Sequence, residues 1–138
     1  MSTPSKKEIY EAAIQKYMES LAKFDVDGLN SIFTEDAQVY SPLLGWLSTK
    51  VFFEKMHKIA DPEKSSQIPH NTLISSEGKN TIAKHFTYNL VLKDGRKTSF
   101  EAVDIFEFND QNLITKETII YDTHQLRIDM GGNILDFD

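Results

Sequence analysis

The sequence predicts an α+β domain in which N-terminal helices pack on a curved, mostly antiparallel sheet and enclose a pocket. Apolar residues at helical spacing are concentrated before residue 62, whereas three strand-like segments occupy residues 81–122. These three segments are joined by the turn sequences of residues 93–96 and 109–112. Such segregation of helices and strands along the chain is typical of the α+β class. Helices on the concave face leave a cone open at one end, which is a natural small-molecule site.

The composition excludes several classes of function. The chain has 138 residues, 40% hydrophobic and 26% charged, as expected for one soluble globular domain. A formal charge of −6 disfavours nucleic-acid and anionic-membrane surfaces, and no apolar run is long enough to span a membrane. The N-terminus lacks the apolar core of a signal peptide. We therefore expect a cytoplasmic protein with neither nucleic acid nor membrane as a partner.

Three helices are expected in the first half of the chain. The first is capped by Thr3-Pro4 or by Ser5 with Glu8, and its apolar stripe runs through Tyr10, Ile14, Tyr17, Leu21 and Phe24. The second is capped by Asp25 or Asp27 and carries Val26, Leu29, Ile32 and Phe33. The third follows Ser48 or Thr49 as its cap and ends at Asp61-Pro62.

The remaining segments are read as strands, one loop and a tail. A short strand is expected over residues 37–40, followed by a bend at Ser41-Pro42 and an apolar loop over residues 43–47. A longer strand is expected over residues 68–76, before the three segments of residues 81–122. The domain is expected to end at residue 127, and residues 128–138 form a tail that is either mobile or folded over the pocket.

The central segment, residues 97–108, carries the most informative side chain. Strand alternation puts Asp104, Phe106 and Phe108 on one face, and Val103, Ile105 and Glu107 on the other. A carboxylate between phenylalanines is costly unless it is paired, hydrogen-bonded or protonated, so Asp104 is a candidate site residue. The alternative is a structural hydrogen-bond acceptor that ties the first helix to the sheet.

Several segments in this order resemble a known family. Residues 15–29, 33–42, 95–98, 103–109 and 114–122 are similar to the nuclear transport factor 2-like superfamily, and within it to SnoaL-like and ketosteroid isomerase-like proteins. The resemblance extends from Pro4 to about Leu126. It implies a cone-shaped, cystatin-like roll, a fold that hosts enzymes, binding proteins and scaffolds.

The resemblance also implies roles for two residues. In the isomerase branch, a tyrosine on the first helix and a protonated aspartic acid on a central strand donate hydrogen bonds to a developing enolate. The matching residues are Tyr17 and Asp104, our two catalytic candidates, although Tyr17 also fits a core tyrosine. The isomerase has its carboxylate base where this chain has Ser41, and a serine hydroxyl cannot hold the abstracted proton. Asp104 is then either a neutral donor or the base itself.

Further residues are candidates for the pocket wall. Ser41 belongs to it by position, and Asp122 is either a rim acid or a turn residue that ends the last strand. The apolar candidates are Trp46, Phe52, Phe53, Met56, Phe86, Tyr88, Phe106 and Ile120. Taken together they favour an apolar ligand.

No metal site or cofactor is expected. The histidines, His57, His70, His85 and His124, lack the spacing of a metal site on one helix, and three ligands would have to converge from separate elements. His70 is instead near enough to the start of its strand to reach the mouth of the cone. The absence of cysteine excludes thiolate ligands, disulfides and a cysteine nucleophile. There is no glycine-rich phosphate loop.

These observations lead to one functional expectation with one alternative. The domain is expected to bind a small, mostly apolar molecule bearing a carbonyl or hydroxyl. If it is an enzyme, the chemistry is acid–base proton transfer next to a carbonyl, of the isomerase, cyclase or dehydratase (lyase) type. The alternative is a non-catalytic ligand carrier or a dimeric interaction module. A homodimer is expected in either case, because apolar residues such as Val103 and Ile105 on the outer sheet face need cover.

Overall fold

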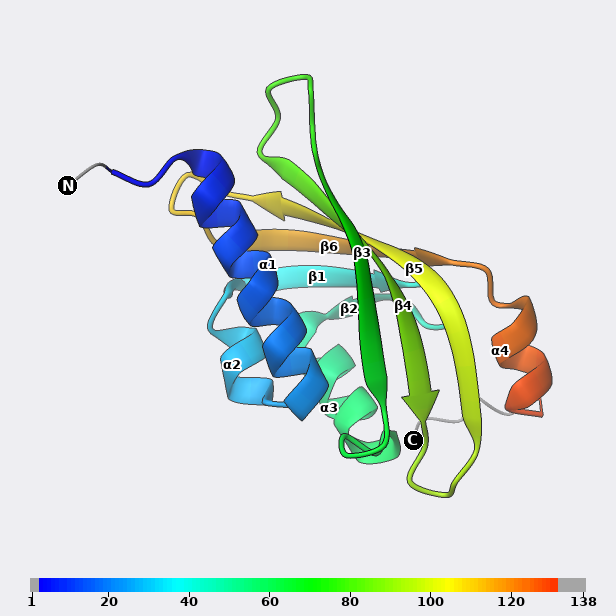
Figure 1. Ribbon diagram of the computed structural model, residues 1–138. Coiled ribbons are helices and arrows are strands. Elements are labelled where there is room, and N and C mark those ends of the chain that lie inside the picture. Colours follow the sequence, from blue (N-terminus) through cyan, green and yellow to red (C-terminus); the bar gives the residue numbers. More distant parts are fainter. Residues whose placement is uncertain (1–2, 132–138) are drawn as a thin grey trace.

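Helix α1, Lys6–Lys23, lies against the inner face of a six-stranded curved sheet (Figure 1). The computed structural model describes residues 3–131. Within that range no helix combines the length and the apolar character needed to cross a membrane. Helix and sheet meet through aromatic rings, since Tyr10 stacks on Phe108 at 4.1 Å and Tyr17 meets Phe106 edge-on at 4.8 Å between ring centroids. The α+β class and the cone-like arrangement are as the sequence predicted.

Side chains that precede each of the first three helices act as caps. Ser5 accepts a hydrogen bond from the Glu8 amide at the start of α1, so the Ser5 alternative is the one used. Asp25 caps α2, Val26–Asn30, by accepting from the Gly28 amide. Ser48 caps α3, Thr49–Ile59, by accepting from the Val51 amide.

The sheet is mixed and open. Its strands are β1 Phe33–Ser41, β2 Gly45–Ser48, β3 Ser66–Ile74, β4 Thr81–Val91, β5 Lys97–Phe108 and β6 Ile114–Tyr121. They lie side by side in the order β2-β1-β6-β5-β4-β3. All neighbouring strands are antiparallel except β1 and β6, which run parallel. This order puts β2 and β3, which are consecutive in the chain with α3 between them, at opposite edges of the sheet.

The first two strands differ from the expectation. Residue Phe33, expected in the second helix, begins β1, because it pairs with Ile114 of β6 and the Ile114 amide donates to the Ile32 carbonyl. Long-range pairing here overrides the local helical spacing. Residues 43–47, expected as a loop, include most of β2, which pairs back on β1 after a turn in which Gly45 has φ +75°.

A fourth helix, α4, His124–Asp129, was not predicted and spans the expected boundary between domain and tail. It lies at the far end of the sheet from α2 (Figure 1). Thr98 Oγ1 donates to Asp129 Oδ2 at 2.7 Å, and Arg96 donates to the Met130 carbonyl at 2.9 Å. The first residues of the expected tail are therefore held against β5, and residues 132–138 lie outside the described residues.

Candidate functional site

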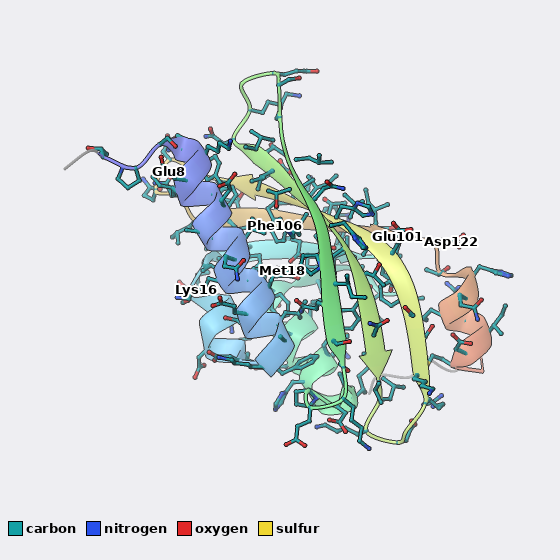
Figure 2. The ribbon with its side chains drawn as sticks, viewed as in Figure 1. Glu8, Lys16, Met18, Glu101, Phe106 and Asp122 are labelled. Carbon is teal, nitrogen blue, oxygen red and sulfur yellow. The ribbon has the colours of Figure 1, made fainter. Side chains whose placement is uncertain are left out.

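Strand β5 puts Asp104 on the inner face of the sheet, as alternation predicts. Asp104, Phe106 and Phe108 are buried, whereas Val103 and Ile105 on the outer face are half-buried. Figure 2 shows Phe106 between helix α1 and the sheet. Asp104 is 2% exposed, so its carboxyl group is removed from bulk water and has to find partners within the fold.

A cavity lies between the inner face of the sheet and the helices. Its volume is ≈ 70 Å³, taken as the space open to the centre of a water-sized sphere. That is several times the roughly 10–15 Å³ that one water needs, so a small organic molecule has room to enter. The lining residues are Tyr17, Leu21, Ser41, Leu43, Leu44, Phe52, Met56, Ile59, Phe86, Tyr88, Leu90, Phe100, Asp104, Ile119, Tyr121 and Leu126. The wall is mostly apolar, with Asp104 as its carboxyl group.

Most of the expected pocket residues lie at or directly behind this wall. Both catalytic candidates line the cavity, as do the expected wall residues Ser41, Phe52, Met56, Phe86 and Tyr88. Phe53 and Phe106 do not line it and are buried beside Tyr17, with ring centroids 6.2 and 4.8 Å from the Tyr17 ring. These two residues support the wall from the core.

Three other residues lie away from the cavity and correct the expectation. Trp46 is 50% exposed, because β2 aligns it with Tyr40 on the outer face, where Lys116 Nζ lies 5.0 Å from its ring centroid. Ile120 is 50% exposed, because it pairs with Val103 on the outer face. Asp122 is exposed and accepts from the His124 amide at 2.9 Å, so it serves the turn before α4.

Tyr17, Glu117 and Asp104 form a buried polar cluster, and Tyr17 and Asp104 of this cluster line the cavity. The Tyr17 hydroxyl donates to Glu117 Oε2 at 2.7 Å, while Asp104 Oδ2 lies 3.5 Å from the same hydroxyl. A hydroxyl has one hydrogen, and the shorter contact to Glu117 takes it. Asp104 Oδ1 and Glu117 Oε1 accept no hydrogen bond from the described residues. The Tyr17 hydroxyl therefore donates to Glu117, and Asp104 Oδ1 is left without a donor among the described residues.

Burial sets the protonation of this cluster. Loss of hydration raises the pKa of Asp104 to about 7, an effect that its polar contacts with Glu117 and Tyr17 partly offset. Burial, followed by the nearby charge of Asp104, raises the pKa of Glu117 well above its ordinary range. Burial and the charges of both carboxyls raise the pKa of Tyr17 as well. Burial thus favours the protonated form of Glu117, and Asp104, with a pKa of about 7, is poised between its two forms at neutral pH.

Ser41 and Tyr121 are two further residues with a hydroxyl group that line the cavity, in addition to Tyr88. Ser41 Oγ accepts from the Leu43 and Leu44 amides at 3.2 and 3.3 Å, an arrangement that leaves its own hydrogen for another acceptor. Tyr121 stacks on Phe100 at 4.2 Å, and burial, with a smaller effect from the charge of Asp104, raises the pKa of Tyr121. Both hydroxyls can donate to a bound molecule.

The lysine in register with Asp104 does not form an ion pair with it. Lys84 is the direct cross-strand neighbour of Asp104 on β4, but its ammonium donates to Thr72 Oγ1 at 3.1 Å. No ion pair joins Lys84 to Asp104 within residues 3–131. The raised pKa of Asp104 therefore persists despite a lysine in register with it.

The SnoaL-like domain model matches residues 14–117 of the chain. The chain belongs to the SnoaL-like family. No curated protein is significantly similar to it in sequence. The match ends at Glu117, so it covers every member of the buried polar cluster.

Solved structures share the fold of this SnoaL-like domain at low sequence identity. PrhC from Penicillium brasilianum is 17% identical, with a TM-score of 0.77 over 94% of this chain and 90% of its own. The epoxide hydrolase/cyclase-like enzyme SalBIII, which has a role in pyran ring formation in the polyether salinomycin, is 15% identical, with a TM-score of 0.72 over 86% and 95%. A protein of ketosteroid isomerase-like fold from Catenulispora acidiphila, in complex with trimethylamine, is 8% identical, with a TM-score of 0.72 over 86% and 92%.

Sequence reasoning missed two polar residues of this SnoaL-like site, Glu117 and Tyr121. Glu117 lies in the run Lys116-Glu117-Thr118, whose polar character suggests a solvent-exposed segment. Alternation on β6 contains the signal that finds them, because Glu117 shares its parity with the buried Ile119 and with Tyr121. The strand pairs Glu117 with Phe106 of β5, which fixes it on the inner face beside Asp104.

Proposed function

We propose that this SnoaL-like protein binds a small, mostly apolar molecule bearing a carbonyl and moves a proton next to that carbonyl, with Asp104 as the proton carrier. The observation that carries this proposal is that Asp104 lines an apolar cavity and that its Oδ1 has no hydrogen-bond partner among the described residues. A buried carboxyl group with no partner for one oxygen is costly in an empty fold. A ligand whose hydrogen-bonding group meets this oxygen removes that cost.

The pKa of Asp104 supports a role in acid–base chemistry. A group that carries a proton in both directions works best when its pKa lies near the working pH, and Asp104 has a pKa of about 7. Glu117, which accepts from the Tyr17 hydroxyl, lies beside Asp104 on the inner face of the sheet, and burial favours its protonated form. In this proposal the ionised Asp104 takes a proton from the carbon next to the carbonyl, and the neutral acid returns it at another position.

The developing negative charge on the substrate oxygen needs a donor other than Tyr17. Tyr17 donates to Glu117, but Tyr121 and Ser41 also line the cavity, and each has a hydroxyl that can donate. We assign them to the substrate oxygen. This arrangement differs from the one that the isomerase resemblance implies, in which the tyrosine of the first helix donates to the substrate and a carboxylate occupies the position of Ser41.

A second reaction is favoured by the neutral form of Asp104, the carboxyl that lines the cavity. The neutral acid can protonate the oxygen of an epoxide, and the carboxylate that remains can take the proton released by the attacking nucleophile. The epoxide hydrolase/cyclase-like neighbour supports testing this class of substrate. Epoxides with an internal hydroxyl, which close to cyclic ethers, form the second arm of the experiment.

The test measures proton exchange directly and needs no knowledge of the product. The protein is incubated in heavy water with a panel of small cyclic ketones, and loss of the hydrogens next to the carbonyl is followed by NMR. We expect exchange with the wild type and at least a hundredfold slower exchange with Asp104→Asn. The matched control is Glu107→Gln, on the outer face of the same strand, which we expect to exchange at the wild-type rate.

Binding is measured in parallel by titrating the protein with a planar phenol, which resembles an enolate. The absorbance of the phenol reports binding. If the protein binds a ligand but catalyses neither proton exchange nor epoxide opening, it is a ligand carrier and the proposed catalysis is wrong. An exchange rate that Asp104→Asn leaves unchanged would also contradict it. If neither ketones, epoxides nor phenols bind, the ligand class itself is wrong.

We also propose a homodimer formed through the outer face of the sheet. Val103 and Ile105 are half-buried there, and the neighbouring Ile120 is 50% exposed, so these apolar side chains lie together on β5 and β6. Covering such side chains with a second copy removes them from water. Sedimentation analysis should give a dimer for the wild type and a monomer for Ile120→Lys. A monomeric wild type would overturn this proposal.

A further inference from the structure

A second cluster of polar side chains lies on the outer face of the sheet. Its members do not line the cavity. It consists of His70 on β3, His85 on β4 and Glu101 on β5. One possible ligand atom from each residue lies within 4.8 Å of the other two. Figure 2 shows Glu101 on β5, on the opposite side of the strand from Phe106. We propose that these three residues bind a divalent transition-metal ion, with Zn²⁺ as the reference ion.

A bulge in the sheet makes the convergence possible. The register between β3 and β4 shifts between Pro69 and Asn71, so His70 is the extra residue and His85 faces Asn71. In such a bulge two successive residues oppose one residue of the partner strand and the local backbone is re-aimed. His70 therefore meets His85 on the outer face, with ring centroids 4.9 Å apart, instead of reaching the mouth of the cone.

The ligand set has the chemistry of a transition-metal site. Two imidazoles with one carboxylate occur as catalytic zinc ligands and as the facial triad of non-haem iron, and these sets keep positions open for water. The His85 Nε2 and Glu101 Oε1 atoms are 2.7 Å apart, and ligand atoms around a tetrahedral zinc are about 3.3 Å apart for bond lengths of roughly 2.0–2.1 Å. The side chain of Glu101 is 67% exposed, so small torsional changes suffice to admit the ion.

Asn71 can hydrogen-bond to Nδ1 of His85, the ring nitrogen that would not bind the metal. Its side-chain amide lies 3.2 Å from His85 Nδ1. When the metal takes the Nε2 lone pair, Nδ1 carries the hydrogen, and the amide oxygen of Asn71 accepts it after a half-turn of the amide group. Such outer partners orient a metal-bound imidazole and typically change metal affinity by 10–100-fold. His70 is held in a similar way, since its Nε2 lies 2.7 Å from Thr87 Oγ1.

The test is a calorimetric titration of metal-free protein with zinc chloride. We expect saturable binding in the wild type, at least tenfold weaker binding in His70→Ala and His85→Ala, and about tenfold weaker binding in Asn71→Ala. Magnesium chloride should not compete, because Mg²⁺ prefers oxygen ligands. The matched control is the double variant His57→Ala and His124→Ala, which removes the other two histidines of the chain and should bind as the wild type does.

A second measurement keeps the inference testable if a variant fails to fold. In the wild type, NMR signals from the imidazoles of His70 and His85 should shift on addition of zinc and return on chelation, while those of His57 and His124 stay in place. The inference is overturned if the wild type binds no zinc, or if the affinity is unchanged in His70→Ala and His85→Ala. Equal shifts of all four imidazoles would also overturn it.

Discussion

Carboxyl side chains on the two faces of the sheet lie in opposite environments, one exposed to water and one buried. Glu101 and Asp104 lie three residues apart on β5, yet the side chain of Glu101 is 67% exposed and Asp104 is 2% exposed. On the outer face Glu101 meets an imidazole in contact with water, whereas on the inner face Asp104 meets Glu117 and has a raised pKa. The difference teaches that burial, set by strand parity, decides whether a carboxyl of this sheet is an ordinary ion or a proton carrier.

The largest expected contrast between the faces is in packing. Phe106→Ala should lower the free energy of unfolding by about 3–5 kcal/mol, because Phe106 is fully buried against Tyr17 and its removal leaves a cavity. The neighbour on the other face, Ile105→Ala, should cost roughly 1–2 kcal/mol, since Ile105 is half-buried. Chemical denaturation measures both. Equal losses would mean that the outer face is as tightly packed as the inner one.

The second largest expected difference between the faces is in how the free energy of unfolding depends on pH. Burial raises the pKa of Asp104 from 3.8 to about 7, so the folded protein binds a proton there that the unfolded chain has released. The stabilisation from this proton is complete below about pH 4 and is lost as the pH rises through about 7, at roughly 1.4 kcal/mol per pH unit. Relative to Asp104→Asn, the wild type should lose at most about 4 kcal/mol over this window.

The measurement is a series of urea denaturations between pH 4 and pH 8 for both proteins. The control is Glu107→Gln, whose curve should run parallel to that of the wild type because Glu107 is on the outer face. If the curve of Asp104→Asn also runs parallel, Asp104 titrates as an ordinary surface acid and the contrast between the two faces fails.

A smaller effect is expected from a single hydroxyl. Tyr17→Phe keeps the ring and its aromatic contacts but leaves Glu117 Oε2 without its donor, which should cost about 1–3 kcal/mol. Tyr40→Phe, beside Trp46 on the outer face, is the matched change and should stay within about 0.5 kcal/mol. Thermal denaturation of the pair tests this, and a similar result for both would show that the inner hydroxyl has no special role.

The smallest effect is expected at the outer face itself. Glu101→Gln in metal-free protein removes the charge that faces His85, and an exposed pair of this kind contributes about 0–1 kcal/mol. Denaturation in the presence of a chelator measures it. A loss above about 2 kcal/mol would mean that the pair is a structural element of the sheet, and would weaken the contrast between the faces.

Part of the site follows from local pattern and part does not. The parity of residues 97–108 is sufficient to place Asp104 on the inner face, because β5 has no irregularity between Lys97 and Glu107. Glu117 was not selected because the sequence alone does not show that β6 aligns it with Phe106 on the inner face of the sheet. Trp46 was assigned to the wall because β2 was read as a loop, which removed the pairing with Tyr40 that turns it outward.

The sequence by itself determined the three N-terminal helices, the face of β5 that carries Asp104 and the family resemblance. Each of these depends on residues that are close in the chain, such as the apolar stripe of the first helix or the alternation around Asp104. Only the tertiary structure decided that Glu117 joins Asp104 and that a bulge brings His70 to His85. The physical reason is that strand register is a property of two segments at once, so contacts across strands are fixed only when the whole sheet forms.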